Sequence, residues 1–314
     1  MLLCKGGAMK RSVNKGSPQS GFTLIELLIS ITLGFVVIGA VLVMHQTGSA
    51  ATRMATAQGQ MNEDAQMALS VLAHELRIAG FNPTRNVGGA RNDLRQGGWT
   101  IFGCDNTFTD ETVPLVSGLT CTAGTGNSAI ALVSEGDPFS GRRTQLTNLP
   151  MDCIGNGVAA DPTPSIDGGN YHTMQARIYI ANNAIMCKGS GDLAQAQALA
   201  ENIDSLLIRY GVTNAANQVL GYLSANAINT ATDANLVALA PLQRWDRVVS
   251  AQICVVVMSE NPVLNDIRDQ TDATANPTYR DCDDGLVAIT DGRLRRTYRT
   301  TVLLRNHGVG FIDA

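Results

Sequence analysis

The chain has 314 residues, of which 45% are hydrophobic and 16% are charged, and its formal net charge is −4. This composition is typical of a folded protein with one large or two small domains, and it excludes a disordered chain. The first 21 residues hold four basic residues and no acidic one, so the remaining residues carry −8, four charges more negative than the whole. An acidic body without a dense basic patch argues against nucleic-acid binding.

A run of 23 mostly apolar residues, from Phe22 to Met44, follows the basic leader, and Glu26 is its one ionisable side chain. A helix of this length spans roughly 34 Å, enough to cross a hydrocarbon core of about 30 Å. The favourable free energy of inserting its Phe, Leu, Ile and Val residues into lipid is larger than the cost of inserting one acidic residue near the end of the run. Because the basic residues lie only before the run, we expect a single-pass inner-membrane anchor with a cytoplasmic N-terminus and a periplasmic body.

A cleavable secretory signal is the alternative to a retained anchor. The segment "GSAA" at 48–51 has the small residues of a cleavage site. The apolar region of such signals is about 7 to 15 residues long and rarely holds an acid. The length of this run and Glu26 therefore favour a helix that stays in the mature protein.

The helix is predicted to continue past the membrane as an amphipathic segment. Its apolar stripe recurs at spacings of three, four and seven, typical of one helix face: Met54, Met61, Ala65, Ala68, Leu69, Leu72, Leu76 and Ala79. The opposite face holds Arg53, Gln60, Glu63, Asp64 and Glu75. Gly80 and Pro83 then end the helix in the usual order. The sequence thus predicts one helix of nearly 60 residues whose second half packs on a sheet.

From about residue 84 the sequence changes to Gly, Asn, Asp and Thr between short apolar runs, a pattern typical of strands and loops. Five segments are β-rich: 128–134, 175–188, 205–212, 246–259 and 295–306. Asn182 and Asn183 stand where a hairpin turn is expected. Segments 135–170 and 260–294 are predicted to be surface loops, and a short helix is predicted at 192–201. The expected fold class is α+β, a long N-terminal helix packed on an antiparallel sheet domain with long loops.

Six of the seven cysteines lie in this domain: Cys104, Cys121, Cys153, Cys187, Cys254 and Cys282. The seventh, Cys4, lies in the leader and is absent if translation starts at Met9. An even number of cysteines in a periplasmic domain indicates disulfides, with fifteen possible pairings. We propose neighbour pairing in chain order, which closes loops that each contribute about 3 to 4 kcal/mol of stability. Zinc is disfavoured, because no two of the six have the short spacing of a zinc site.

No motif for catalysis was found in the chain. It lacks G-x-S-x-G, H-E-x-x-H and G-x-x-x-x-G-K-[ST], and His45, His74, His172 and His307 are scattered. The acidic segment "DCDDG" at 281–285 does not fit the EF-hand pattern, so we expect a solvated loop there. A calcium-binding loop of another type is the alternative. We expect a protein that is not an enzyme and that has no cofactor and no metal. A membrane-anchored periplasmic enzyme is the rival class.

The N-terminal segment resembles the processing signature of the type IV pilin superfamily: a basic leader ending in Gly21, then "FTLIE" and an unbroken apolar helix. The resemblance implies that a prepilin peptidase cuts between Gly21 and Phe22 and methylates the new N-terminus. It also implies that Glu26 pairs with the Phe22 amine of a neighbouring subunit during assembly, since a buried charge is tolerated when it is paired. The alternative for Glu26 is a carboxylate that reaches the membrane interface.

The C-terminal half is similar to the PilW-type minor pilins in the order of its segments: 198–212, then Tyr222 and Leu223, then 245–260 and 295–306. The helix end at 74–83 fits the same pattern. The resemblance implies a minor pilin that primes type IV pilus assembly and sits at or near the tip, supporting adhesion and twitching motility. Its implied partners are other minor pilins, the inner-membrane assembly platform and a tip adhesin. The alternative is a minor pseudopilin of a type II secretion system.

These inferences divide the chain into four parts. Residues 1–21 are a cleaved leader, and 22–44 are the transmembrane and assembly half of the helix. Residues 45–80 are its periplasmic amphipathic half, and 81–314 form a β-rich periplasmic domain.

Overall fold

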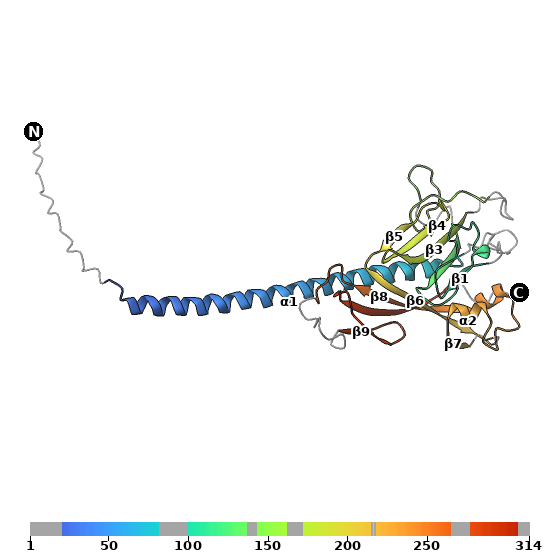
Figure 1. Cartoon of the computed structure of the whole chain (residues 1–314). Coiled ribbons are helices and arrows are strands. Elements are labelled where there is room, and N and C mark those ends of the chain that lie inside the picture. Colours follow the sequence, from blue (N-terminus) through green and yellow to red (C-terminus); the bar gives the residue numbers. More distant parts are fainter. Residues whose placement is uncertain are drawn as a thin grey trace, which may run out of the picture. The chain divides into compact units, whose positions relative to one another are not determined.

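The structure is a computed structural model of the whole chain (Figure 1). It describes residues 21–81, 99–136, 143–161, 172–214, 216, 218–264 and 277–306. Predictions that concern Cys4, Met9, Pro83 and His307 lie outside these residues. The chain divides into two compact units, residues 1–52 and 53–314, and each is described by itself.

Helix α1 (Leu24–Ile78) begins in the first unit and ends in the second. Its 55 residues are slightly fewer than the nearly 60 predicted. The helix contains no proline, so its backbone hydrogen bonds need not be interrupted. It ends before Gly80, whose φ of +73° is the left-handed conformation that glycine adopts readily at a helix end. The predicted end of the helix at Gly80 is therefore confirmed, and Pro83 lies outside the described residues.

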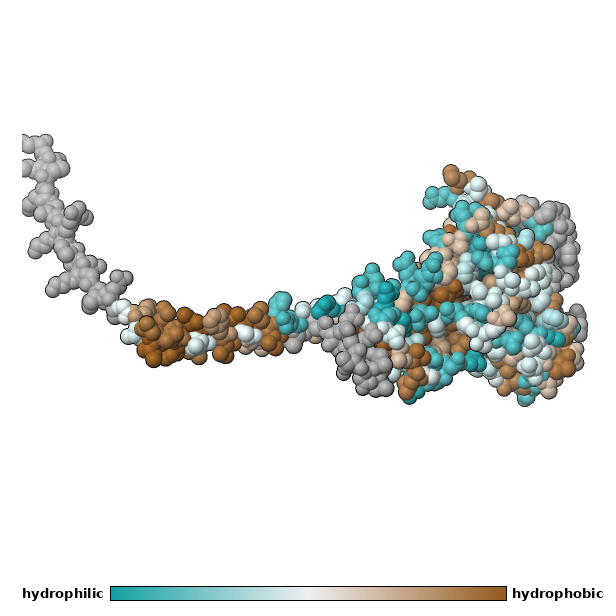
Figure 2. Space-filling view, in the orientation of Figure 1, coloured by the Kyte–Doolittle hydropathy of each residue, from teal (hydrophilic) through white to brown (hydrophobic). Residues whose placement is uncertain are grey.

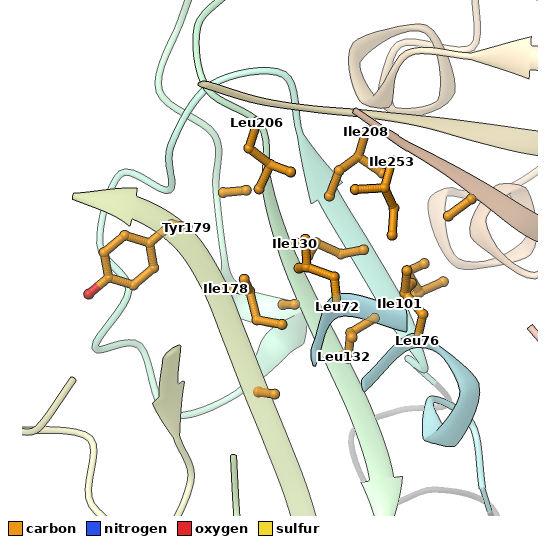
Figure 3. Packing of buried hydrophobic residues seen from close by; sticks show 14 of the residues in the cluster. Leu72, Leu76, Ile101, Ile130, Leu132, Ile178, Tyr179, Leu206, Ile208 and Ile253 are labelled. Atoms are coloured by element: carbon orange, nitrogen blue, oxygen red, sulfur yellow. The ribbon is translucent and has the colours of Figure 1, made fainter. Parts of the chain in front are cut away.

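The part of α1 in the second unit buries the predicted apolar stripe. Buried side chains recur along one face, with alanines between larger residues: Met61, Ala65, Ala68, Leu72, Leu76 and Ala79. The alanines allow the helix backbone to approach the sheet closely. Figure 3 shows Leu72 and Leu76 beside Ile101, Ile130 and Leu132 of the first sheet. Full burial of each such side chain contributes about 1.5 to 3 kcal/mol to folding.

The first sheet has five antiparallel strands in chain order: β1 (Ile101–Cys104), β2 (Ala129–Glu135), β3 (Thr173–Ala181), β4 (Ala184–Gly189) and β5 (Gln197–Ala200). Asn182 and Asn183 join β3 to β4 with φ of 53° and 56°. Two consecutive positive φ angles are the type I′ geometry that matches strand twist, and Asn tolerates it better than most residues. The hairpin predicted at this position is confirmed.

The second sheet has the order β11-β8-β6-β7: β6 (Ile203–Thr213), β7 (Val219–Leu223), β8 (Val248–Met258) and β11 (Arg295–Leu303). Strand β8 lies inside the sheet and is almost entirely buried, which explains its run of Val and Ile. Short elements surround the sheets: η1 (Val116–Gly118), α2 (Ala225–Asn229), α3 (Pro241–Trp245), and the hairpin of β9 (Thr278–Arg280) and β10 (Leu286–Ala288). The predicted α+β class, with a long helix on antiparallel strands, is confirmed.

Side-chain and backbone hydrogen bonds attach the second half of α1 and its end to both sheets. Asn202, at the junction of β5 and β6, donates to the Asp64 carboxylate at 2.9 Å. The Tyr298 hydroxyl of β11 lies 2.5 Å from Asn62 Oδ1. At the helix end, Gly80 N donates to the Val133 carbonyl at 2.8 Å. These polar contacts fix the rotation of a helix whose apolar stripe alone would permit small slips.

Two predictions about local structure were wrong. The segment 192–201, predicted as a short helix, contains strand β5 at 197–200, because these residues pair with the edge of β4 and bury Ala200. Pairing outweighs the helix propensity of its Ala, Gln and Leu residues. The loop predicted at 260–294 contains the β9–β10 hairpin, whose turn is closed by Asp281.

Three disulfides tie loops to strands. Cys104, at the end of β1, is bonded to Cys121. Cys187 of β4 is bonded to Cys153, and Cys254 of β8 is bonded to Cys282 in the turn between β9 and β10. Each bond joins one cysteine to the next cysteine along the chain, so the six cysteines of the domain pair in chain order.

Candidate functional site: the start of the long helix

The candidate assembly site begins where the chain enters α1. Gly21 and Phe22 precede the helix and are exposed, with 87% of Phe22 accessible. Apart from its neighbours in the chain, no atom of the described residues lies within 4 Å of the place where a Cβ on Gly21 would stand. Both residues that flank the Gly21–Phe22 peptide bond are therefore exposed in the part of the chain that the structure describes.

Thr23 and Glu26 form a capping box at the N-terminus of α1. Glu26 Oε2 accepts hydrogen bonds from Thr23 N and from Thr23 Oγ1, both at 2.9 Å. Thr23 Oγ1 in turn accepts from Glu26 N at 3.3 Å. The pair satisfies backbone N–H groups that no helical carbonyl can reach. Sequence reasoning singled out Glu26 and missed Thr23, although the T-x-x-E spacing before an apolar run is the signal of such a cap.

The cap occupies only part of the Glu26 carboxylate. Both contacts with Thr23 use Oε2, and among the described residues no hydrogen bond reaches Oε1. The carboxylate is also close to the helix start, where the macrodipole favours negative charge. Glu26 can therefore stabilise its own helix and still offer one oxygen to a donor outside the chain.

The apolar residues that follow Glu26 are exposed on every side of the helix. Exposed large side chains run from Phe22 to Met44, and each is at least 47% accessible. Figure 2 colours this stretch brown over almost its whole surface. The best window of the helix has a mean hydropathy of 2.8, so by length and composition it is able to cross a membrane. An isolated helix with such a surface needs lipid or other apolar helices around it.

The few hydroxyl groups in this stretch bond to the helix itself. Ser30 Oγ donates to the Glu26 carbonyl at 2.7 Å, and Thr32 Oγ1 donates to the Ile29 carbonyl at 2.9 Å. Such bonds remove the cost of placing a hydroxyl in lipid. Glu26 is therefore the one side chain of the stretch that carries a charge into an apolar environment.

The acidic segment at 281–285 is a turn whose carboxylates already have donors. Asp281 Oδ1 accepts from Asp283 N and Gly285 N at 2.9 and 2.7 Å. Arg209 and Arg299 form ion pairs with Asp283 and Asp284. Within the part of the chain that the structure describes, no group of three or more His, Cys, Asp or Glu side chains is arranged to hold a metal.

A cavity of about 360 Å³ lies in the second unit between the end of α1, β2 and β3. Its lining is mainly apolar and includes Ile78, Leu132 and Met174. Ser134 and His74 also line it, but no hydrogen bond between them is present among the described residues. The cavity thus has residues of a kind that catalysis uses without the contact that activates a serine.

Two family models match this sequence. The model described as "Type IV Pilus-assembly protein W" matches residues 168–306, and the "Prokaryotic N-terminal methylation motif" matches residues 16–42. The second match contains Gly21, Phe22, Thr23 and Glu26, and the first covers every strand from β3 to β11. No curated protein matches the sequence at a significant level.

Two solved structures are similar to the chain at low identity. A type IV-like pilin from Thermus thermophilus has 9% identity and a TM-score of 0.36, with 80% of this chain and 100% of that chain covered. A chain of the GspK-GspI-GspJ complex of the type 2 secretion system from enterotoxigenic Escherichia coli has 10% identity and a TM-score of 0.28, with coverages of 78% and 97%. Because both scores lie below 0.5, the family assignment rests on the two sequence models.

Proposed function

Because this chain belongs to the type IV minor pilins of the PilW type, we propose that it primes type IV pilus assembly and sits at or near the pilus tip with other minor pilins. The observation that supports this most is the combination of two features in one chain. A carboxylate stands at the start of an exposed apolar helix, and a disulfide-tied strand domain follows it. In this role the protein supports adhesion and twitching motility.

The proposed pathway begins in the inner membrane. A prepilin peptidase cleaves after Gly21 and methylates Phe22, while residues 22–44 stay in the bilayer and the domain after residue 81 stays in the periplasm. The exposed Gly21–Phe22 bond supports cleavage at this position. The subunit then leaves the lipid through the assembly platform, and residues 22–44 pack against the helices of other pilins. A tip adhesin is a further partner in this proposal.

Glu26 is the proposed assembly residue. Cleavage gives Phe22 a positively charged amine, and the Glu26 carboxylate of a neighbouring subunit pairs with it as the helices bundle. Oε1 is the oxygen for this contact, because Oε2 accepts from Thr23 within the chain. A paired charge is tolerated in an apolar environment, whereas an unpaired one opposes packing. The pair therefore sets the register between neighbouring helices.

We infer that the protein acts as a structural subunit and not as an enzyme. The PilW model covers strands β3 to β11, which form most of the strand domain. Assembly requires the helix and the surface of the domain, and no chemical step on a substrate.

Deletion of the gene tests the proposal against the type II secretion alternative. We expect loss of surface pili and of twitching, and normal release of secreted proteins. Complementation with the full chain is expected to restore both pili and twitching, and the protein is expected in the sheared filament fraction. Normal piliation with loss of secreted proteins would assign the chain to a type II secretion system instead.

A further inference from the structure

One corner of the strand domain is almost without charge. From Thr213 to Gln243 the sequence holds a single charged residue, Asp233, whereas 16% of the whole chain is charged. The described residues of this stretch form β7, α2 and the start of α3, and we call them the low-charge corner. In Figure 2, brown side chains are exposed in the region where Figure 1 labels β7 and α2.

The low-charge corner exposes large apolar side chains. The exposed fractions are 57% for Val219, 40% for Leu220, 40% for Tyr222 and 65% for Val237. β7 is the outer strand of its sheet among the described strands. Exposed strands usually carry charged residues that prevent association, and an apolar one without them marks an interaction site.

The opposite edge of the same sheet makes the contrast clear. Strand β11 carries Arg295, Arg296 and Arg299 within nine residues. Arg295 and Arg299 form ion pairs with carboxylates of the chain, and the β9–β10 hairpin contacts β11, where Thr297 Oγ1 donates to the Arg280 carbonyl. Charged residues and a covering hairpin both protect an edge from unwanted pairing. The sheet therefore has one protected edge and one that is open to an apolar partner.

A β-bulge in β7 explains why neighbouring apolar residues are exposed together. Val212 pairs with Gly221 and Thr213 pairs with Val219, so Leu220 has no partner on β6. An extra residue of this kind turns a side chain away from the regular alternation. Val219 and Leu220 are consequently both exposed, although they are adjacent in sequence.

The α2 segment that follows β7 in the low-charge corner is held in place. The Asp105 carboxylate accepts from Ala225 N and Asn226 N at 2.8 and 2.9 Å, which caps α2. Asn229 Oδ1 accepts from the indole Nε1 of Trp245 at 2.9 Å, and Trp245 is 1% exposed. A surface on a fixed backbone loses little conformational entropy when it binds, so association is favoured.

We propose that the low-charge corner docks another pilin subunit of the same filament, which meets it with an uncharged apolar surface of its own. This inference rests on the proposed function. Asp233 is the one charged residue of the corner. The Asp105 carboxylate beside the corner already accepts from Ala225 N and Asn226 N, so charged groups of a partner would lose solvation with few charges to pair with. The centres of protein interfaces are likewise poor in charged residues and rich in tyrosine, and the corner exposes Tyr222. A second copy is a poorer occupant, because two bodies that each carry −8 after residue 21 repel one another.

Site-specific photocrosslinking in pilus-forming cells tests the inference. Benzoylphenylalanine replaces Tyr222 in the full-length chain, and the matched control places it at Leu286 of β10, which is 67% exposed beside charged residues. We expect an adduct from position 222 with another pilin, at a peptide without charged residues, and at least tenfold less from position 286. An adduct with a second copy, with lipid or with a charged peptide, or equal yields from both positions, would overturn the inference.

A pair of lysine variants gives a second measurement. We expect Tyr222→Lys to reduce the protein in sheared filaments at least tenfold, while Leu286→Lys leaves it within about twofold of wild type. Both side chains are exposed, so the melting temperature of each variant in detergent is expected to equal that of wild type. Equal incorporation of both variants would overturn the inference and leave the proposed function intact. Absence of wild type from the filaments would overturn both.

Discussion

Glu26 has two roles in this account, and the structure shows how to separate them. Glu26→Gln keeps an acceptor oxygen for Thr23 N and Thr23 Oγ1, because glutamine also forms the capping box. It removes only the negative charge. Thr23→Val has nearly the same size as wild type and removes the hydroxyl that donates to Glu26 Oε2 and accepts from Glu26 N. The backbone N–H of residue 23 and the charge of Glu26 remain. Each variant therefore tests one role.

The expected effects differ by more than tenfold. Loss of a helix cap changes the equilibrium constant for forming the helix by about fivefold. Loss of one partner of a buried charge pair changes the equilibrium constant for packing the helix into the filament by roughly 100-fold or more. We thus expect Glu26→Gln to be almost absent from sheared filaments, and Thr23→Val to be present within about fivefold of wild type.

Quantitative immunoblots of sheared filaments and of inner membranes measure both effects. We expect both variants to be cleaved normally, because neither substitution covers the exposed bond between Gly21 and Phe22. Their membrane levels are expected to match wild type. The account of Glu26 fails if Glu26→Gln enters filaments normally. It also fails if Thr23→Val is lost to the same extent, since the carboxylate would then act only through the cap.

Three further predictions concern the strand domain. Leu72→Ala is expected to lower the free energy of unfolding by about 2 to 5 kcal/mol, whereas Met67→Ala, on an exposed position of α1, changes it by less than about 0.5 kcal/mol; urea titrations in detergent compare them, and equal effects would contradict the packing of α1. Replacing Cys153 and Cys187 by serine is expected to cost about 3 to 4 kcal/mol in the same titration, and an unchanged midpoint would contradict a structural disulfide. Hydrogen bonds from Arg295 lower the pKa of Asp291 to about 2. The ion pair therefore stabilises the fold above pH of about 4, and this stabilisation is lost as the pH falls towards 2. Asp291→Asn is expected to flatten the pH dependence of the free energy of unfolding in that range, and an unchanged profile would exclude this contribution.

The helix could be predicted from sequence in detail because its signals are local. The stripe that includes Leu72 and Leu76 has the period of one helix face, and Gly80 marks the end. Thr23 was not predicted, although the T-x-x-E spacing before an apolar run is an equally local signal. The candidate site could therefore have been predicted in full.

The strand domain was less predictable because its short elements depend on distant neighbours. Strand β5 has a helical composition and becomes a strand through pairing with β4. Strand β1 contains Gly103, where a Cβ would stand 2.2 Å from the Tyr210 hydroxyl, so its glycine serves a contact more than 100 positions away. The bulge at Leu220 likewise depends on the register between β6 and β7. Local propensity contains no information about such contacts.

The low-charge corner could also be predicted only in part from the sequence. The absence of charge between Thr213 and Gln243 is visible in the sequence, but its significance is not. An uncharged stretch is usually part of a buried core. Only the fold shows that Val219, Tyr222 and Val237 are exposed.

The mature N-terminus is the most direct test of the central claim, that an exposed apolar helix with Glu26 near its start remains in the working protein. Purification from membranes and from sheared filaments, followed by N-terminal sequencing and mass spectrometry, identifies the first residue. We predict a chain that begins at an N-methylated Phe22 and retains residues 22–44. A mature chain that begins after Met44 would contradict the account, because neither the anchor nor Glu26 would then be present to assemble.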